Sequence, residues 1–166
     1  MEAPSFSLAV NNRPIFWKTI PNYGKTKGGV IAIPLTVAVQ QPKHGSPHLE
    51  YNIYLSEAGN FTLHTFVSPT IDFTGTDGLK FAVSIDNEMP ITVNISSNYA
   101  NEGAWEQSVA NAIKIFKIPF SFDKPGKHTI KYWMINPGIV LQKLVLDLGG
   151  LKPSFLGPPE STISTK

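Results

Sequence analysis

The feature that most constrains the fold of this chain is an alternation of apolar and polar residues with a period of two. In residues 49–56, Tyr51, Ile53 and Leu55 share one side of the run, and residues 61–68 alternate in the same way. Successive side chains of a strand point to opposite faces, so this pattern is typical of half-buried strands. The turn-forming residues 57–60 lie between the two runs, which predicts that they form a hairpin.

Runs of the same kind recur along the chain, divided by sequences rich in proline, glycine, asparagine and aspartate. They span residues 79–85, 91–95, 113–117, 127–135 and 139–148. A further apolar run covers residues 30–39, and Pro34 interrupts it. Because proline cannot donate to a strand ladder, we predict that this run lies at a sheet edge.

Helical periodicity is weak throughout the chain. The best candidate for a helix is residues 102–113, whose apolar positions fit a loop leading into a strand equally well. The 14 prolines and 13 glycines are spread along the sequence and mark no internal boundary. We therefore predict one all-β domain over residues 1–166, with its core in residues 17–148 and a surface tail in residues 149–166. About eight or nine short strands favour a β-sandwich or jelly roll.

Composition excludes several kinds of protein. The chain has no cysteine, which excludes disulfides and thiolate metal sites. Its formal net charge is +2 and Arg13 is its single arginine, so the basic face of a nucleic-acid-binding protein is missing. No apolar run approaches the ~20 residues of a membrane span. We therefore expect neither a nucleic acid nor a membrane as partner.

The first residues do not follow the pattern of a signal peptide. Residues 1–10 lack both a basic start and a long apolar segment. Two interpretations stay open: a cytoplasmic protein, or a piece of a longer chain whose signal lies upstream.

Several segments carry a resemblance to a known family. Residues 125–131 (Pro-Gly-Lys-His-Thr-Ile-Lys), 136–143 (Asn-Pro-Gly-Ile-Val-Leu-Gln-Lys) and 149–161 (Gly-Gly-Leu-Lys-Pro-Ser-Phe-Leu-Gly-Pro-Pro-Glu-Ser) resemble the closing part of the C-terminal domain of glycoside hydrolase family 115. Residues 20–26 and 84–90 resemble earlier segments of that domain, so the likeness extends from about residue 17 to residue 161.

The resemblance implies a galactose-binding-like β-sandwich that serves as an accessory module. The parent enzymes are α-glucuronidases that remove glucuronic or 4-O-methylglucuronic acid from xylan side chains, and their catalytic carboxylates lie on a separate upstream barrel. The parent enzyme is expected to be secreted or periplasmic, whereas the location of the chain itself is left open. On this basis the chain alone is not expected to be an enzyme.

The residues themselves offer little catalytic or metal-binding chemistry. Glycoside hydrolysis usually needs two facing carboxylates, but the acids here fall mostly in turns, where they form or cap loops. The four histidines show no metal-ligand spacing. Asp147 is a candidate calcium ligand by likeness to related jelly rolls, but the acidic partner expected in residues 6–12 is missing. We therefore predict no catalytic residue, no metal and no cofactor.

Aromatic residues are the remaining candidates for ligand contacts, because indole and phenol rings stack on the apolar face of a sugar. The candidates in or beside irregular segments are Trp17, Tyr23, Tyr99 and Trp105. Burial in the core is the competing interpretation for each of them. Arg13 is the one residue with the fork geometry for a uronate carboxylate.

Four aromatic residues fall out of phase with the core side of their strands: Tyr54, Phe66, Phe116 and Trp133. Such positions would be polar if both outer faces of a sandwich met water. We therefore predict that loops or another domain cover one outer face. In the tail, we expect Leu151, Phe155 and Leu156 to hold residues 149–161 on the surface.

These observations predict a non-catalytic β-sandwich that packs against the catalytic domain of the parent enzyme or against a second subunit. The alternative is a carbohydrate-binding module whose partner is a xylan-type polysaccharide such as glucuronoxylan. An independent enzyme is the third interpretation. Exposed aromatics in a groove would favour the second, and a large bare apolar patch would favour the first.

Overall fold

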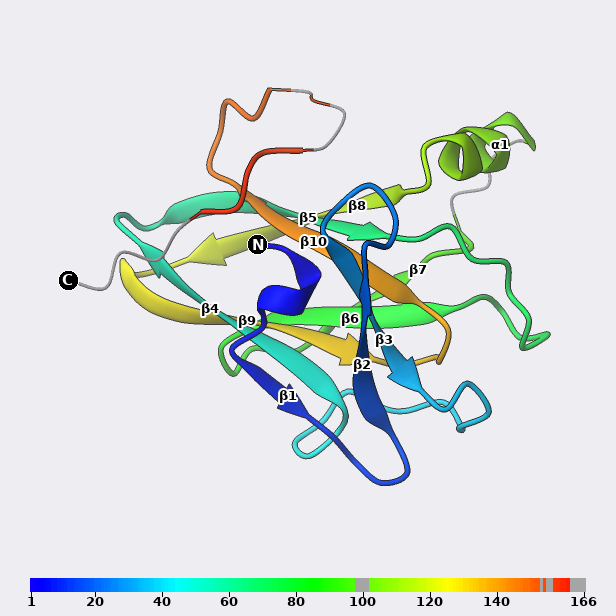
Figure 1. Ribbon diagram of the computed structural model, residues 1–166. Helices are drawn as coiled ribbons and strands as arrows, with labels where there is room; N and C mark the ends of the chain where they lie inside the picture. The colour runs from blue at the N-terminus through cyan, green and yellow to red at the C-terminus, as the bar shows by residue number, and fades with distance from the viewer. Residues whose placement is uncertain (98–101, 153, 155–156, 162–166) are drawn as a thin grey trace.

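A computed structural model describes residues 1–97, 102–152, 154 and 157–161. Two antiparallel five-stranded sheets stack face to face, which confirms the predicted β-sandwich (Figure 1). The first sheet, in spatial order, contains β1 (Leu8–Val10), β4 (His48–Leu55), β9 (Gly126–Met134), β6 (Lys80–Ile85) and β7 (Ile91–Asn94). The second contains β2 (Phe16–Pro21), β3 (Gly28–Ile33), β10 (Val140–Asp147), β5 (Gly59–Val67) and β8 (Lys114–Phe122).

The core lies between the two sheets and is rich in aromatic side chains. On β8, burial alternates strictly, so that every second side chain from Phe116 to Phe122 is buried. Phe81 of β6 stacks on Tyr132 of β9, with ring centroids 5.2 Å apart. It also meets Phe116 from the opposite sheet edge-on at 5.8 Å. Aromatic contacts therefore bridge the layers and fix their separation.

The predicted hairpin of residues 49–56 and 61–68 is wrong. β4 pairs with β1 and β9, whereas β5 pairs with β10 and β8 in the other sheet. The connection between them crosses from one layer to the other. Alternation alone cannot separate these cases, because a sandwich corner and a hairpin both present one apolar side to the same core.

The predicted edge position of residues 30–39 is also wrong. β3 pairs with β2 on one side and β10 on the other, so it lies inside its sheet. The strand ends at Ile33, and Pro34 follows it outside the ladder. The proline therefore ends the strand and removes no hydrogen bond from its interior.

The helix candidate at residues 102–113, which the sequence left undecided, forms a short helix. α1 covers Glu102–Ala110 and lies between β7 and β8 in the chain order. A short 3-10 helix, η1 (Ala3–Ser5), precedes β1. Among the described residues, no helix has the length and apolar character needed to cross a membrane.

The four out-of-phase aromatics take three different positions. Phe116 belongs to the central core, so its predicted outward position is wrong, and its neighbour Ile115 is the exposed residue on β8. Phe66 and Trp133 do lie on outer faces, yet both are buried. Phe66 packs with Ile113, Val145 and Leu151, while Tyr54 is 73% exposed.

The C-terminal segment provides part of the cover over Phe66. Leu151 packs against the Phe66 cluster, and the carbonyl of Pro158 accepts a hydrogen bond from Lys143 Nζ at 3.1 Å. Glu160 Oε1 accepts a hydrogen bond from the backbone N–H of Glu2 at 2.8 Å. Phe155 and Leu156, which we expected to hold the tail, lie outside the described residues.

Candidate functional site

The two carboxylates of the loop before β6, Asp72 and Asp77, contact groups close to them in the chain. Asp72 accepts hydrogen bonds from the hydroxyl and backbone N–H of Thr74 and from the N–H of Gly78, at 2.6, 2.9 and 3.1 Å. These bonds, the Thr74 hydroxyl first, lower the pKa of Asp72. Asp77 contacts Lys80 Nζ at 2.6 Å. Both acids therefore organise the loop before β6.

The metal-binding chemistry of the described chain is sparse. No group of three or more His, Cys, Asp or Glu side chains within residues 1–97, 102–152, 154 and 157–161 could hold a metal ion. Asp147, the residue considered for calcium, accepts a hydrogen bond from the N–H of Gly149 at 2.9 Å and lies 3.7 Å from His64 Nε2. Its carboxylate therefore binds the backbone just beyond the end of β10.

The four aromatic residues proposed for ligand contact are dispersed. Trp17 is half-buried on β2, donates Nε1–H to the carbonyl of Val10 at 3.1 Å, and meets Tyr132 edge-on at 6.1 Å. Tyr23 lies with its ring against Gly29. Trp105 is half-buried on α1, and Tyr99 lies outside the described residues. Their role as sugar contacts stays a prediction.

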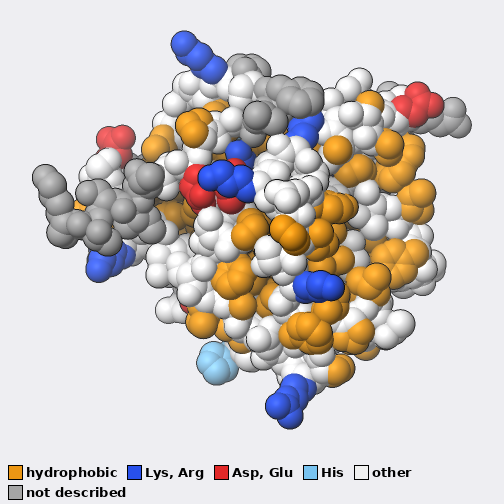
Figure 2. Space-filling model, in the orientation of Figure 1, with side chains coloured by type: hydrophobic (Ala, Val, Ile, Leu, Met, Phe, Trp, Pro, Cys, Tyr) orange, Lys and Arg blue, Asp and Glu red, His pale blue; other side chains and the backbone are white. Residues whose placement is uncertain are grey.

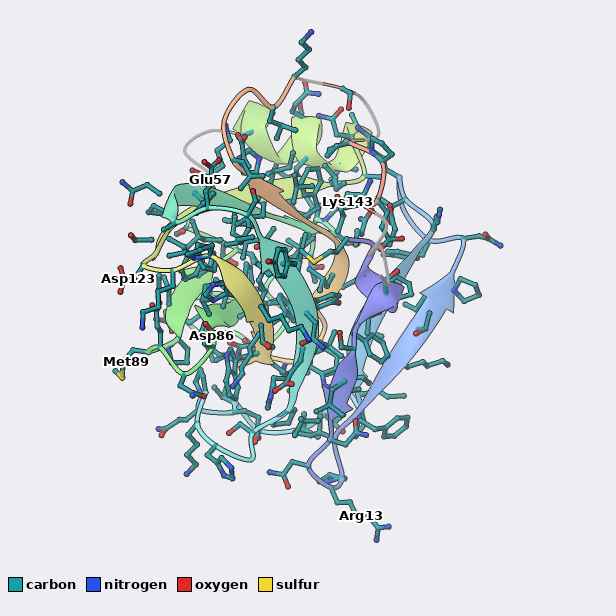
Figure 3. All side chains as sticks on the ribbon, turned by 90° about the vertical axis from the view of Figure 1, so that its left-hand side faces the viewer. Arg13, Glu57, Asp86, Met89, Asp123 and Lys143 are labelled. Atoms are coloured by element: carbon teal, nitrogen blue, oxygen red, sulfur yellow. The ribbon has the colours of Figure 1, made fainter. Side chains whose placement is uncertain are left out.

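Arg13 is equally remote from any cavity lining. It is exposed in the turn between β1 and β2 and projects away from the body of the molecule (Figure 3). Arg13 lines neither of the two larger surface pockets, so a uronate bound to it would not be enclosed by them.

A groove of about 730 Å³ lies on the outer face of the sheet that contains β4 and β9. Leu49, Tyr51 and Tyr132 of these strands are buried in the core, so the alternate residues point outward. Four of these outward side chains form the groove floor: His48, Glu50, Lys131 and Trp133. Residues 42–45 and the β6–β7 turn, residues 86–90, line its two sides.

The strand register brings the floor residues together. His48 is paired with Trp133, and Glu50 with Lys131, across β4 and β9. The rings of His48 and Trp133 lie 4.1 Å apart at 32°, and Trp133 Nε1–H donates to Ser84 Oγ at 2.9 Å. The indole of Trp133 is therefore held by side chains from the two strands that flank β9, His48 on β4 and Ser84 on β6.

A chain of polar contacts continues from this stacked pair. His48 Nε2 lies 3.1 Å from Glu50 Oε1, and its Nδ1 lies 2.7 Å from the carbonyl of Ser46. Lys131 Nζ lies 4.0 Å from the same Glu50 oxygen. Glu50 thus lies between a histidine and a lysine and lines the groove.

The β6–β7 turn forms one side of the groove and is anchored by Asp86. Its two carboxylate oxygens contact His128 Nδ1 at 2.7 Å and the N–H of Thr129 at 2.8 Å. The bond to Asp86 raises the pKa of His128. Met89 stands at the tip of this turn and is 88% exposed, while Asp86 lies at its base (Figure 3).

The outer face of the other sheet has a different character over β2 and β3. Phe16 is paired with Ile33 and Lys18 with Ile31, which places these four side chains on one outward surface. Phe16 is 49% exposed, Leu35 after the end of β3 is 47% exposed, and Phe73, whose ring lies against Gly138, is 53% exposed. Hydrophobic side chains gather over these strands and the loops next to them (Figure 2). We call this surface the β2–β3 face.

Sequence reasoning missed the groove, although it flagged one of its residues. Trp133, one of the four out-of-phase aromatics, is buried, and it also lines the groove. His48 and Glu50 alternate with the buried Leu49 and Tyr51, which marks them as outward-facing. The partner strand and its register were needed to place Lys131 and Trp133 beside them.

Comparison with known families and structures identifies the chain. The profile of the glycosyl hydrolase family 115 C-terminal domain matches residues 1–160. The chain belongs to this family. A comparison with curated protein sequences gives no significant match.

Solved structures share the fold of this family 115 C-terminal domain. A family GH115 4-O-methyl-α-glucuronidase, BtGH115A, with specificity for decorated arabinogalactans, superposes with a TM-score of 0.66 at 15% identity over 88% of this chain and 17% of that one. A family 35 carbohydrate-binding module from Clostridium thermocellum gives 0.56 at 14% identity over 89% and 96%. A Podospora anserina GH26-CBM35 β-(1,4)-mannanase gives 0.58 at 12% over 92% and 28%. At these identities the likeness establishes the fold, and the chain spans only a small part of the glucuronidase and the mannanase.

Proposed function

We propose that this chain is the non-catalytic C-terminal β-sandwich of a family 115 enzyme and that its β2–β3 face packs against another domain or subunit of that enzyme. The observation that carries the proposal is the apolar outward surface on which Phe16 is exposed beside the half-buried Ile31 and Ile33, with the exposed Leu35 two residues beyond the end of β3. Contiguous apolar surface of this kind marks interaction sites on folded proteins.

The arrangement of the strands supports a packing role. Within the described part of the chain, β2 is an edge strand that pairs with β3 alone. Its outward side chains include Phe16 and Ile20, whereas an edge that meets water usually carries charges. Lys18 is the charged residue on the outward side of β2, and its long apolar stem fits beside an apolar partner surface. A neighbour that covers Phe16 would therefore also cover an open sheet edge.

The remaining domains of a family 115 enzyme are the candidate partners. This chain aligns with 17% of the family 115 glucuronidase, so most of that protein lies outside the part matched here. An interface inside one enzyme needs roughly 600–1,500 Å². The β2–β3 face is the described surface with the apolar composition for such an interface. The catalytic step of the whole enzyme is accordingly assigned to another domain.

The test uses the chain both alone and within a full-length family 115 enzyme. Alone, it is expected to bind a hydrophobic dye and to self-associate at high concentration in sedimentation, and Phe16→Glu should reduce both. Within the full-length enzyme, Phe16→Glu should speed proteolytic release of the domain. The matched control is Tyr54→Glu, on the opposite sheet, which should do neither. Equal proteolysis of Phe16→Glu and wild-type enzyme would refute the packing role.

A further inference from the structure

The groove on the outer face of β4 and β9 combines two kinds of surface. Its floor carries the polar set His48, Glu50 and Lys131, with the Trp133 ring stacked against the His48 ring. Its sides include four apolar side chains: Val10, Pro42, Met89 and Pro90. A volume of about 730 Å³ lies within the range of ligand sites, roughly 300–1,000 Å³. A ligand that fits must therefore present apolar faces to the sides and polar groups to the floor.

The charges of the lining disfavour an anionic ligand. Two lysines, Lys43 and Lys131, face three carboxylates, those of Glu50, Asp86 and Glu88. With the histidines neutral, this gives a formal charge of two minus three, or −1. Lys131 lies close to Glu50, and Asp86 contacts His128, so part of the charge of each pair is compensated. The lining therefore offers a ligand carboxylate or phosphate no excess of positive charge.

The hydrogen-bonding groups suit a ligand with several hydroxyls. Glu50 accepts hydrogen bonds and Lys131 donates them, and the His48 Nε2 atom lies 3.1 Å from Glu50 Oε1. A hydroxyl both donates and accepts, so adjacent hydroxyls can satisfy a carboxylate and an ammonium group together. Hydrogen bonds to charged groups are also the stronger ones.

We infer that this groove binds a neutral oligosaccharide. The apolar faces of its sugar rings lie against the sides formed by Met89, Pro90 and Pro42, and its hydroxyls bind Glu50 and Lys131. The Trp133 ring stacks against the His48 ring in the floor, so its fluorescence is expected to change when a ligand binds in the groove. The site lies on the opposite sheet from the β2–β3 face, so binding a glycan and packing against a domain can occur together and fail separately.

The direct test is a titration of the purified chain with neutral hexasaccharides of xylose, mannose and galactose, followed by calorimetry and tryptophan fluorescence. A xylo-oligosaccharide branched with glucuronic acid is the anionic counterpart. At least one neutral hexasaccharide is expected to bind, and more tightly than its uronate-branched form. Glu50→Gln and Lys131→Met should each weaken that binding about tenfold or more.

Two further variants keep the outcome decisive. Met89 is 88% exposed, so Met89→Ala cannot unfold the chain and should still weaken binding. Lys18→Met, the same substitution as Lys131→Met but on the β2–β3 face, should leave the affinity unchanged. The inference fails if no neutral hexasaccharide binds, if the uronate-branched form binds more tightly, or if the three groove substitutions leave affinity at its wild-type value.

Discussion

The two outer faces of this sandwich meet their surroundings in different ways, although the strands beneath them follow the same alternation. Over β4 and β9 the outward side chains are His48, Glu50 and Lys131, which form a polar groove. Over β2 and β3 they are mainly Phe16, Ile31 and Ile33, which leave an apolar surface. Nearer β5 and β10 the second sheet is instead covered by the chain itself, through Ile113 and Leu151. One fold thus supports three kinds of outer surface, because the inward residues alone maintain the core.

The largest expected effect compares one aromatic residue from each outer face. Phe66 is 7% exposed beneath its own cover, whereas Tyr54 is 73% exposed on the groove side. Phe66→Ala should lower the free energy of unfolding by about 3 kcal/mol, since it leaves a cavity. Tyr54→Ala should change it by less than about 0.5 kcal/mol, as is usual at exposed sites. Urea unfolding of both variants checks this, and equal effects would mean that the faces are covered alike.

The next comparison uses one lysine from each outer face. Lys143 lies 3.0 Å from Glu2 with both side chains nearly buried, at 5% and 7% exposure. Lys131 lies 4.0 Å from Glu50 with both more exposed, at 18% and 23%. Lys143→Met leaves a buried carboxylate and should cost about 3 kcal/mol. Lys131→Met should cost about 1 kcal/mol or less.

The measurement for the lysine pair is again the free energy of unfolding at pH 7. The double variant Lys143→Met with Glu2→Gln is the control, and it should recover part of the loss, because no uncompensated buried charge remains. A loss as large in Lys131→Met as in Lys143→Met would show that the groove floor is as dry as the covered face.

A smaller effect depends on pH and belongs to the groove side. The hydrogen bond to Asp86 raises the folded-state pKa of His128 above its usual value. The charged histidine therefore stabilises the fold below pH ~6.5, and this contribution is lost as pH rises through the raised folded pKa. Asp86→Asn keeps the side-chain shape but removes the charge, so its destabilisation should be about 1 kcal/mol at pH 5.5 and smaller at pH 8.5.

Thermal unfolding across pH 5–9 measures this difference, with Asp77→Asn as a surface control. Asp77 contacts Lys80 and no histidine among the described residues, so Asp77→Asn should show no such trend. His64 works in the opposite direction: burial lowers its pKa, and its contribution is lost as pH falls through that lowered value. A pH-independent effect of Asp86→Asn would contradict the role given to His128.

The last prediction is that the purified chain has no glucuronidase activity. The purified chain should release no glucuronic acid from aldouronic acids or glucuronoxylan, because the turn acids Asp72 and Asp77 bind local groups and the catalytic part is assigned elsewhere. Product analysis after prolonged incubation measures this. If the chain did release glucuronic acid, and if Glu50→Gln in the groove abolished that activity, the prediction would be wrong and the groove would be an active site.

Much of the strand content was predictable from the sequence because it rests on local patterns. The alternating residues of β4, β5 and β6 place the same side chains in the core that the period of two indicated. The phase failed at β8, where the apolar Ile115 points outward and Phe116 inward. Apolar residues on both sides of that strand gave two possible phases, and neighbouring strands chose between them.

The candidate site was less predictable, because its parts come from distant segments. His48 is 85 residues away from Trp133, and Glu50 is 81 residues away from Lys131, as the numbers of each register pair give. No local pattern carries the information that β4 lies beside β9 and not beside β5. Aromatic character alone pointed to Trp17 and Tyr23, of which Trp17 turns toward the core and Tyr23 packs on Gly29.

The all-β class, most of the strands and the family could be predicted from the chain alone, since alternation, turn composition and family motifs are local features of the sequence. The separation of β4 and β5 into different sheets, the cover of Phe66 by Leu151, and the placing of a polar groove and an apolar face on opposite sides became visible only in the folded structure. The physical reason is that a strand's phase depends on its own residues, whereas pairing and cover depend on which distant surfaces bury the most apolar area together.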